Sequence, residues 1–382
     1  MKVAIAGGGI VGLTLARLLR ARGFEPTVFE RMPESVYIRR GYMMGYHAYP
    51  PLEELGILKD LRPQGRDIAP GAGGGDAVAI CIEVGKLIHA LADGLPVEYE
   101  HTVAGLRRDD DGRIIGLTVK GPPKDGSKFT PPSQGTFGQT TEGPQLIGGV
   151  VKDESVETAA DDELRDVDAD LVVACDGMNS PLRNMAGMEA EFTPLGEAAL
   201  SFMSPAVGSV SFAMGYMSDN SHIGTLSWPE GSAGWRTCDK VGAEAALAPG
   251  VEAIKEMWAR LLPESAAAVE GVTSIDQIRY SEPVLMTTPK WWIPGLILIG
   301  DSAHFFGPET GVSSGVGMAD AHALAEAVRQ NPEDPDAACR AFEAWRSPVV
   351  RPLEAMDPGR QRLQVAGPGP RDDERWPPPA AA

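Results

Sequence analysis

The chain of 382 residues carries a formal net charge of −19 at pH 7, and 43% of its residues are hydrophobic. This composition is typical of a globular protein with two or three structural units. Because an acidic surface repels phosphate backbones and anionic lipids, we expect neither nucleic acid nor a membrane as a partner. The four cysteines are isolated and the six histidines form no HxH or HExxH cluster, so the sequence predicts no metal site and a reducing, cytoplasmic location.

The first thirty or so residues predict a strand–helix–strand unit, the size of one right-handed crossover. Residues 2–6 form a short apolar run that is typical of a buried strand. A helix is expected from about Ile10 to Arg22, because apolar residues recur there at helical spacing. A second strand is expected from Thr27 to Glu30.

The turn after the first strand contains GxGxxG at Gly7, Gly9 and Gly12. These glycines allow a tight turn, close approach of a pyrophosphate and close packing of the helix on the sheet. Glu30 ends the second strand, where a carboxylate binds ribose hydroxyls and repels a 2′-phosphate. The pattern favours FAD or NAD over NADP, and a glycine-rich turn without a ligand is the alternative.

Further elements follow in chain order. We expect a helix at 52–62, a helix at 86–92 and a strand at 97–100. Residues 121–168 are rich in Gly, Pro, Ser, Thr and Asp and predict a polar surface insertion. After it come a buried strand at 171–174, an antiparallel sheet within 195–240, helical structure at 251–270, a buried strand at 296–299 and a helix at 314–330.

A second motif begins where the strand at 296–299 delivers Gly300 and Asp301 at its carboxyl end. Ligands bind at that end of the strands in open α/β sheets. Pro308 and Gly311 then lead into the helix, whose N-terminus can stabilise an anionic group.

This segment resembles the second FAD fingerprint of the class A flavoprotein monooxygenases, the p-hydroxybenzoate-hydroxylase-like family. The matching residues are Gly300, Asp301, Ala303, His304, Pro308, Gly311, Asp320, Ala321, Leu324 and Ala325. A third segment is similar to the family's ADGxxSxxR signature, with matches at Asp176, Gly177, Ser180 and Arg183. The resemblance implies that Asp301 binds the ribityl chain of FAD. The full expected cofactor set is Gly7, Gly9, Gly12, Glu30, Arg31, Arg40, Asp176, Gly177, Arg183, Gly300, Asp301, Pro308, Gly311, Val312 and Ser313.

The implied fold is α/β, with a Rossmann-like FAD-binding domain of the p-hydroxybenzoate-hydroxylase type and an antiparallel-sheet substrate domain. We assign residues 1–75, 86–185 and 285–345 to the discontinuous FAD-binding domain. Residues 76–85 and 186–284 are assigned to the substrate domain, and 346–382 to a C-terminal helix and tail. Whether the protein is a monomer or a homodimer stays open.

The resemblance also implies the chemistry. NADH or NADPH reduces FAD, the reduced flavin traps O2 as a C4a-hydroperoxide, and one oxygen atom passes to a small aromatic, apolar or polyketide-like substrate. Since the flavin carries the hard step, no catalytic residue is assigned, and His47 and His304 are candidates. Either histidine alternatively has a structural or surface role. The expected substrate-contacting residues are Met44, Tyr46, Met203, Phe212, Met214, Tyr216, His222 and Trp228, with ordinary sheet core as the alternative.

The sequence departs from the family pattern at three places, one of which is the polar insertion at 121–168, either inert, a lid or a partner surface. Ser313 stands where a glycine is usual, and the Arg-containing segment before residues 86–92 is missing, so Lys86 is the alternative contact for a phosphate or nicotinamide. Three other functions therefore remain open: a flavin dehydrogenase or reductase, a flavin-dependent halogenase suggested by Trp291–Pro294, and a flavin-binding structural or sensing protein.

Overall fold

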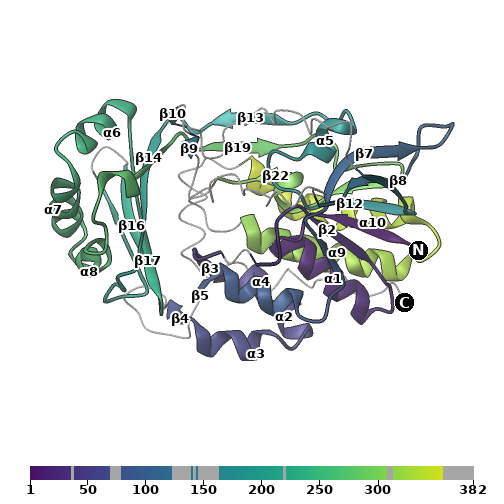
Figure 1. Ribbon diagram of the computed structural model, residues 1–382, viewed down its shortest axis with the longest axis horizontal. Helices are drawn as coiled ribbons and strands as arrows, with labels where there is room; N and C mark the ends of the chain where they lie inside the picture. Colours follow the sequence, from purple (N-terminus) through teal and green to yellow (C-terminus); the bar gives the residue numbers. More distant parts are fainter. Residues whose placement is uncertain are drawn as a thin grey trace.

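The computed structural model describes residues 1–35, 38–68, 79–122, 139–140, 143–144, 163–217, 221–307 and 313–355. The described residues form two layers that lie side by side (Figure 1). One layer is built around a mainly parallel sheet and the other around a five-stranded antiparallel sheet. A small three-stranded sheet lies between them.

The parallel sheet has six strands in the order β20-β21-β12-β1-β2-β6. Five of them run parallel and β20 is antiparallel to β21. Because β1 and β12 are buried at every position, both faces of the sheet are covered, as the unbroken apolar runs in these strands predict. The strands are β1 (Val3–Ala6), β2 (Thr27–Glu30), β6 (Val97–Tyr99), β12 (Leu171–Ala174), β20 (Trp292–Ile293) and β21 (Leu296–Leu298).

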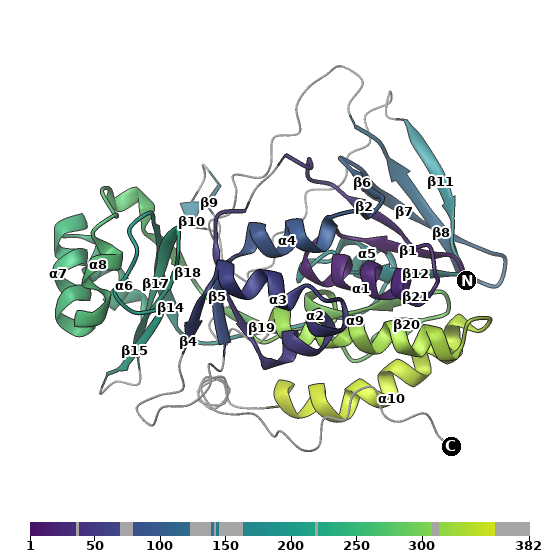
Figure 2. The same cartoon turned by 90° about the horizontal axis from the view of Figure 1, so that it is seen from below.

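Helices α1 (Ile10–Ala21) and α9 (Ser313–Gln330) pack against each other beside this sheet, and α10 (Pro335–Glu354) packs on α9 (Figure 2). A second, antiparallel sheet lies against β12 in the order β11-β8-β7. Its strands are β7 (Thr102–Arg108), β8 (Ile114–Lys120) and β11 (Leu164–Asp168). The short strands β9 (Gln139–Thr140) and β10 (Gly143–Pro144) pair only with each other within the described residues.

The small sheet between the two layers has the order β3-β5-β4. It shares a buried core with the helices that flank it. These elements are β3 (Gly41–Gly45), η1 (Tyr46–Ala48), α2 (Tyr49–Glu54), α3 (Leu58–Leu61), η2 (Arg62–Gln64), β4 (Arg66–Ile68), β5 (Ala79–Glu83) and α4 (Val84–Ala92).

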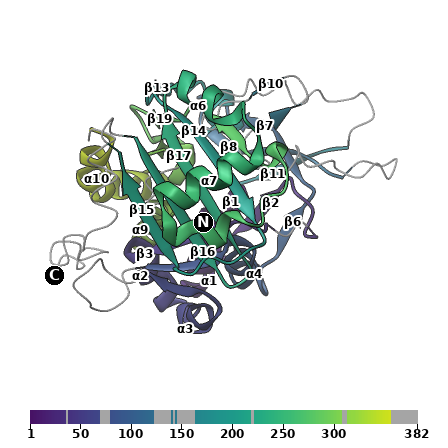
Figure 3. The ribbon, with the colours of Figure 1, turned by 90° about the vertical axis from the view of Figure 1, so that its left-hand side faces the viewer.

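The antiparallel sheet has five strands in the order β15-β16-β17-β14-β18. Helices cover its outer face, and Figure 3, viewed from that side, has them in front of the strands. The strands are β14 (Ala198–Ser204), β15 (Phe212–Tyr216), β16 (His222–Trp228), β17 (Gly231–Cys238) and β18 (Arg279–Ser281). The covering elements are α6 (Lys240–Leu247), α7 (Val251–Leu261), η3 (Pro263–Ser265), α8 (Ala266–Val269) and η4 (Ile275–Gln277).

The three-stranded sheet β13-β19-β22 connects the two layers (Figure 1). Its strands are β13 (Glu191–Pro194), β19 (Val284–Thr287) and β22 (His304–Phe305). The short elements α5 (Pro181–Met185) and η5 (Gly300–Ser302) follow β12 and β21, and they carry the two later sequence motifs.

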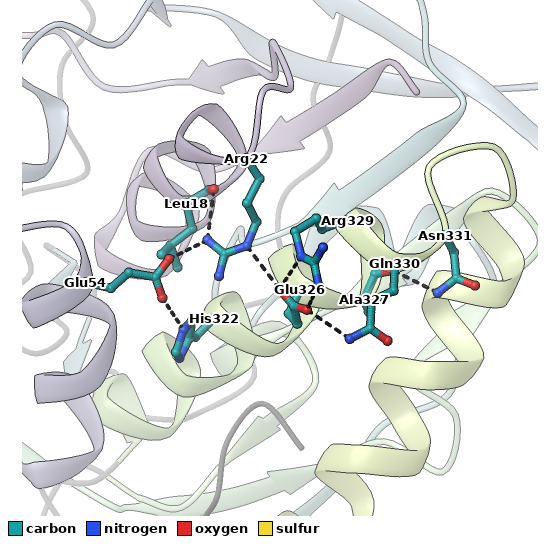
Figure 4. A network of polar contacts seen from close by, with 9 residues as sticks. All are labelled: Leu18, Arg22, Glu54, His322, Glu326, Ala327, Arg329, Gln330 and Asn331. Carbon is teal, nitrogen blue, oxygen red and sulfur yellow. Dashed lines mark hydrogen bonds and ion pairs between the residues drawn. The ribbon is translucent and has the colours of Figure 1, made fainter. Parts of the chain in front are cut away.

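Polar contacts between helices fix how α1, α2 and α9 meet (Figure 4). The Glu54 carboxylate of α2 accepts hydrogen bonds from Arg22, just past α1, and from His322 of α9, both at 2.7 Å. The Arg22 guanidinium also lies 3.5 Å from the carboxylate of Glu326. Hydrogen bonds from Arg329 lower the pKa of Glu326 to about 2, so this carboxylate is charged at neutral pH.

Three expected elements differ from those observed. The helix expected at 52–62 is two short helices, α2 and α3, because Gly56 adopts a positive φ of 71° between them. The helical region at 251–270 is broken where Pro263 begins η3. The last residues of the expected insertion, 164–168, form β11 and extend a sheet. Most of the insertion, and residues 356–382, lie outside the described residues.

Candidate active site

The three glycines of the first turn differ in what surrounds them. A Cβ on Gly7, whose φ is 107°, would lie 2.3 Å from the carbonyl oxygen of Cys175. A Cβ on Gly12 would lie 2.0 Å from the carbonyl oxygen of Gly7. A Cβ on Gly9 would meet no described atom within 4 Å, and no side chain caps the helix that begins after it. Gly7 and Gly12 therefore serve close packing, whereas Gly9 leaves open space at a helix N-terminus, which suits a pyrophosphate.

Glu30 lies directly beside this turn. Its Oε2 accepts a hydrogen bond from the Gly8 N–H at 2.7 Å, and its Oε1 accepts one from the Met32 N–H at 2.8 Å. The carboxylate is thus held at the carboxyl end of β2, where a ribose would lie. The neighbouring Arg31 is exposed.

Asp301 lies in η5, at the carboxyl end of β21. Its Oδ1 is buried and has no hydrogen-bond partner among the described residues. Burial raises the pKa of Asp301 to about 6, against the opposing positive charges of His304 and Arg40. A buried acceptor without a donor is costly, so a ligand hydroxyl at this position would relieve it. Together with the open space at Gly9, this buried acceptor fits an FAD molecule that spans the two motifs.

The third motif connects the other two. Asp176 accepts hydrogen bonds from the Ser302 hydroxyl at 2.9 Å and from the Leu182 N–H at 3.1 Å. The Gly177 N–H donates to the Ser302 hydroxyl at 3.1 Å. Arg183 is buried, and it donates to the carbonyl oxygens of Met178 and Ser302 at 2.8 and 3.0 Å. These contacts favour a bracing role for Arg183, which holds the Asp301 turn in position.

A buried charged network supports the same turn from behind. The Asp320 carboxylate lies 2.7 Å from His304 Nε2, 2.7 Å from Arg346 Nε and 3.1 Å from the Gly300 N–H. Burial opposes ionisation of Asp320, but the charges of His304 and Arg346 hold its pKa below the usual range. This arrangement favours the structural alternative for His304. Sequence reasoning did not identify Arg346, because its position on α10 carries no motif.

The other candidate histidine lies in η1. Burial and the nearby positive charge of Arg346 lower the pKa of His47 to about 4, so the imidazole is neutral at neutral pH. A Cβ on Gly315 of α9 would lie 3.2 Å from the Cβ of His47, so the histidine is close to the N-terminal end of α9. His47 therefore remains a candidate for contact with a ligand at that helix end.

Ser313 takes the place of the usual family glycine. It begins the described part of α9, and its hydroxyl accepts a hydrogen bond from the Phe306 N–H at 3.2 Å. The expected cofactor residues Pro308, Gly311 and Val312, and the side chain of Tyr46, lie outside the described residues.

Six of the eight expected substrate-contacting residues share one face of the antiparallel sheet. Pairing of β15 with β16 places Phe212 opposite Leu226 and Tyr216 opposite His222, and partners that face each other across an antiparallel pair point the same way. Strand alternation, with the pairing of β14 and β17, puts the other three on that face too. The six are Met203, Phe212, Met214, Tyr216, His222 and Trp228.

This inner face differs from the face under the helices. Met203, Phe212 and Met214 are only half-buried, whereas Leu200 and Phe202 on the other face are fully buried. Part of the inner face packs against residues of β4 and β5, including Ile68 and Cys81. Trp228 and His222 are buried, which keeps sheet core open as the alternative for those two. Met44 is also fully buried, within the core around α1 and α4, and this position favours the core alternative.

Two other sequence features have structural explanations. Lys86 donates to Glu230 across the two layers and to the carbonyl oxygen of Gln64 at 3.1 Å, so its ammonium already has protein partners. Trp291 is buried against Phe342 and under the guanidinium of Arg351, which lies 4.5 Å from the ring centroid. The residues suggesting a halogenase therefore pack the start of β21.

Neither a metal-binding cluster nor a membrane-spanning helix occurs within the described ranges. No group of three or more His, Cys, Asp or Glu residues there is arranged to hold a metal ion. No helix among those same residues has the length and hydropathy required to cross a bilayer.

Comparison with known proteins agrees with this geometry. Residues 1–78 and 147–352 match the model of the FAD binding domain family. The chain is 24% identical over 364 residues to aurachin C monooxygenase/isomerase of Stigmatella aurantiaca, covering 91% of this chain and 85% of that protein. It is 27% identical over 312 residues to 6-methylpretetramide 4-monooxygenase of Streptomyces rimosus, covering 80% and 70%.

Solved structures with the same fold include PqsL of Pseudomonas aeruginosa in complex with 2-aminobenzoylacetate. It has a TM-score of 0.69 and 16% identity, and the match covers 96% of this chain and 99% of that one. The 2-methyl-3-hydroxypyridine-5-carboxylic acid oxygenase matches with a TM-score of 0.67 and 17% identity over 96% and 93% of the two chains.

The nucleotide-binding turn, the buried Asp301 Oδ1 with no partner among the described residues, and the five-stranded antiparallel sheet define an FAD-binding oxidoreductase. The chain belongs to the FAD binding domain family and is a class A flavoprotein monooxygenase with the p-hydroxybenzoate-hydroxylase type of fold. The expected fold class, cofactor FAD and monooxygenase function are thereby confirmed, and the comparisons do not support the three alternatives.

Proposed function

We propose that this monooxygenase takes electrons from NADH or NADPH and inserts one oxygen atom of O2 into a small aromatic or polyketide-like substrate. The observation that carries the proposal is the inner face of the antiparallel sheet, where Met203, Phe212 and Met214 are half-buried. Met203 and Phe212 pack against residues of the small sheet β3-β5-β4. Aromatic rings and methionine side chains are surfaces that suit a flat, apolar substrate. Two relatives are named as monooxygenases of aurachin C and of 6-methylpretetramide, and these names support the same class of substrate.

FAD supplies the redox chemistry when it is bound, and the residues of the chain position it. Glu30 accepts hydrogen bonds from the adenosine ribose, the Gly9 turn takes the pyrophosphate, and Asp301 accepts a hydrogen bond from the ribityl chain. Asp176, Arg183 and the Asp320 network hold the Asp301 turn. The inner sheet face excludes water from the reacting ring of the substrate.

We also propose that the enzyme works in a reducing compartment such as the cytoplasm. All four cysteines are free, and Cys81, Cys238 and Cys339 are buried as thiols. Buried free thiols are typical of proteins that never meet an oxidising environment.

The direct test is an absorbance spectrum of the FAD-loaded protein, followed by addition of NADH or NADPH in air. Flavin bands that bleach and recover, with oxygen uptake, are expected. A panel of aromatic compounds should then include one that takes up a single ¹⁸O atom from ¹⁸O2. A protein that takes up no FAD, or one that oxidises NAD(P)H with every panel compound but never incorporates ¹⁸O, would contradict the proposal.

A further inference from the structure

A cavity of about 510 Å³ lies where the small sheet β3-β5-β4 meets the five-stranded antiparallel sheet. Its volume is within the range of roughly 300–1,000 Å³ that is usual for small-molecule pockets. The small sheet and the elements beside it contribute charged side chains, whereas the antiparallel sheet contributes mainly apolar ones. The lining includes Arg39, Glu83 and Lys86 from the first side and Met203, Trp228 and Glu230 from the second.

The cavity extends from the surface to the proposed substrate face. Arg39 and Glu230 are exposed, so one end of the cavity meets solvent. Met203 lines the cavity and also lies, half-buried, on the inner face of the antiparallel sheet. A molecule in the cavity would therefore lie next to the face that we propose for substrate binding.

One ion pair crosses the cavity. Lys86 of α4 donates to the carboxylate of Glu230, which lies in the turn between β16 and β17, and to the carbonyl oxygen of Gln64 at 3.1 Å. The side chain of Lys86 is 20% exposed and that of Glu230 is 43% exposed. An ion pair at the surface contributes little free energy, so this contact can open readily.

The other contacts across this junction do not depend on that ion pair. Arg66 of β4 donates to the carbonyl oxygens of Gly208 at 2.8 Å and Ser209 at 3.2 Å. A Cβ on Gly41 would lie 2.4 Å from Cζ3 of Trp228, so the indole packs directly on the backbone of β3. The two sheets therefore stay joined when the long side chains of Lys86 and Glu230 separate.

We propose that small, uncharged aromatic molecules enter through this cavity, and that the Lys86–Glu230 ion pair is the gate that closes it. The lining combines two basic with two acidic side chains, so it favours no ion of either sign, and its indole and thioether surfaces suit an aromatic ring. The inference rests on the proposed function, because it takes the inner sheet face as the destination of the substrate.

The experiment introduces one thiol into the cavity by Met203→Cys and uses the FAD-loaded protein. Peptide mass spectrometry follows alkylation of this thiol by N-phenylmaleimide, an uncharged aromatic probe. Glu230→Gln and Lys86→Met, each added to this variant, should raise the labelling rate about fivefold, the largest effect expected from an exposed ion pair. Because the two changes remove charges of opposite sign, an electrostatic effect on the thiol would instead move the two rates in opposite directions.

Glu252→Gln is the matched control. It breaks the Lys255–Glu252 pair of α7, which has a separation of 3.2 Å and a lysine that is 16% exposed, but which does not line the cavity. This control should leave the labelling rate unchanged. Salt at about 1 M should speed labelling when the gate pair is intact and not in Glu230→Gln, since ions screen the pair.

Four results would overturn the inference: no labelling of the introduced thiol, unchanged rates in both gate variants, acceleration in only one of them, or equal acceleration by Glu252→Gln. Labelling requires no catalysis, so the two proposals fail separately. A protein that labels as expected but never incorporates ¹⁸O contradicts the proposed function alone. A protein that incorporates ¹⁸O but does not respond to the gate variants contradicts only the gate.

Discussion

Gly9 and Gly12 lie three residues apart in one turn, yet a methyl group should have different effects at the two positions. Gly12→Ala forces a Cβ against the carbonyl oxygen of Gly7, so we expect a loss of several kcal/mol in the free energy of unfolding. Gly9→Ala has room and an extended backbone, so the cofactor-free protein should keep its stability within about 0.5 kcal/mol. FAD titration should nevertheless show at least tenfold weaker binding by Gly9→Ala. Normal FAD affinity in that variant would count against the pyrophosphate position.

Asp301 gives a pH-dependent prediction. Its folded-state pKa of about 6 exceeds the ordinary value of 3.8, so the stability that it contributes is fully present below pH 3.8 and is lost as the pH rises through 6. Cofactor-free Asp301→Asn should therefore be more stable than the wild type at pH 8, by on the order of 2 kcal/mol, and the difference should shrink toward pH 4. Urea unfolding between pH 4 and pH 8 measures this difference. A difference that does not change with pH would refute the assignment, and FAD binding should weaken in the same variant.

The contact between η5, α9 and α10 depends on one carboxylate. Asp320→Asn leaves Arg346 buried without its charge partner, so we expect a cost of roughly 3 kcal/mol in the free energy of unfolding. Asp336→Asn is the control, because Asp336 pairs with Arg113 at the same 2.7 Å but both side chains are partly exposed. That pair should contribute about 1 kcal/mol or less. Denaturant midpoints for the two variants are the measurement, and equal losses would show that burial of the Asp320 network adds nothing.

Elements with a strong local signal were predictable from the sequence. The strands β1, β2 and β12 and the helices α1, α4 and α9 were expected within about two residues of their observed bounds, because an apolar run or a helical repeat specifies each of them. The glycine turn and the Asp301 turn could be predicted because their motifs are local in the chain.

Contacts that form only when distant segments pack together could not be predicted, because no local sequence pattern marks them. Arg346 joins Asp320 across 26 residues, and Trp235 acquires its position only when β16 and β17 pair over Gly224. The strand alternation within β15 and β16 could be read from the sequence, but the register that unites six residues on one face depends on pairing between strands.

At the scale of the whole molecule, FAD should act as a stabilising ligand. The residues expected to hold it come from β1–α1, β2, η5 and the start of α9, so the bound cofactor would connect segments that are distant in the sequence. A ligand that binds only the folded state at one hundred times its Kd adds about 2.7 kcal/mol. We expect the unfolding temperature to rise by several degrees in thermal scans with excess FAD, and no comparable rise with FMN, which lacks the adenosine that Glu30 would bind. An equal rise with FMN would contradict the Glu30 assignment.

The order of strands in the parallel sheet has a consequence for synthesis of the protein. Strand β1 leaves the ribosome first, but its neighbour β12 follows about 165 residues later and β21 later still. The antiparallel sheet, by contrast, is continuous from residue 198 to residue 281 and pairs mostly between nearby strands. This sheet can therefore assemble while the parallel sheet still lacks β20 and β21. Until β21 and α9 emerge, one side of β12 and the helix α1 lack their packing partners, so the flavin site can be completed only after α9 has been synthesised.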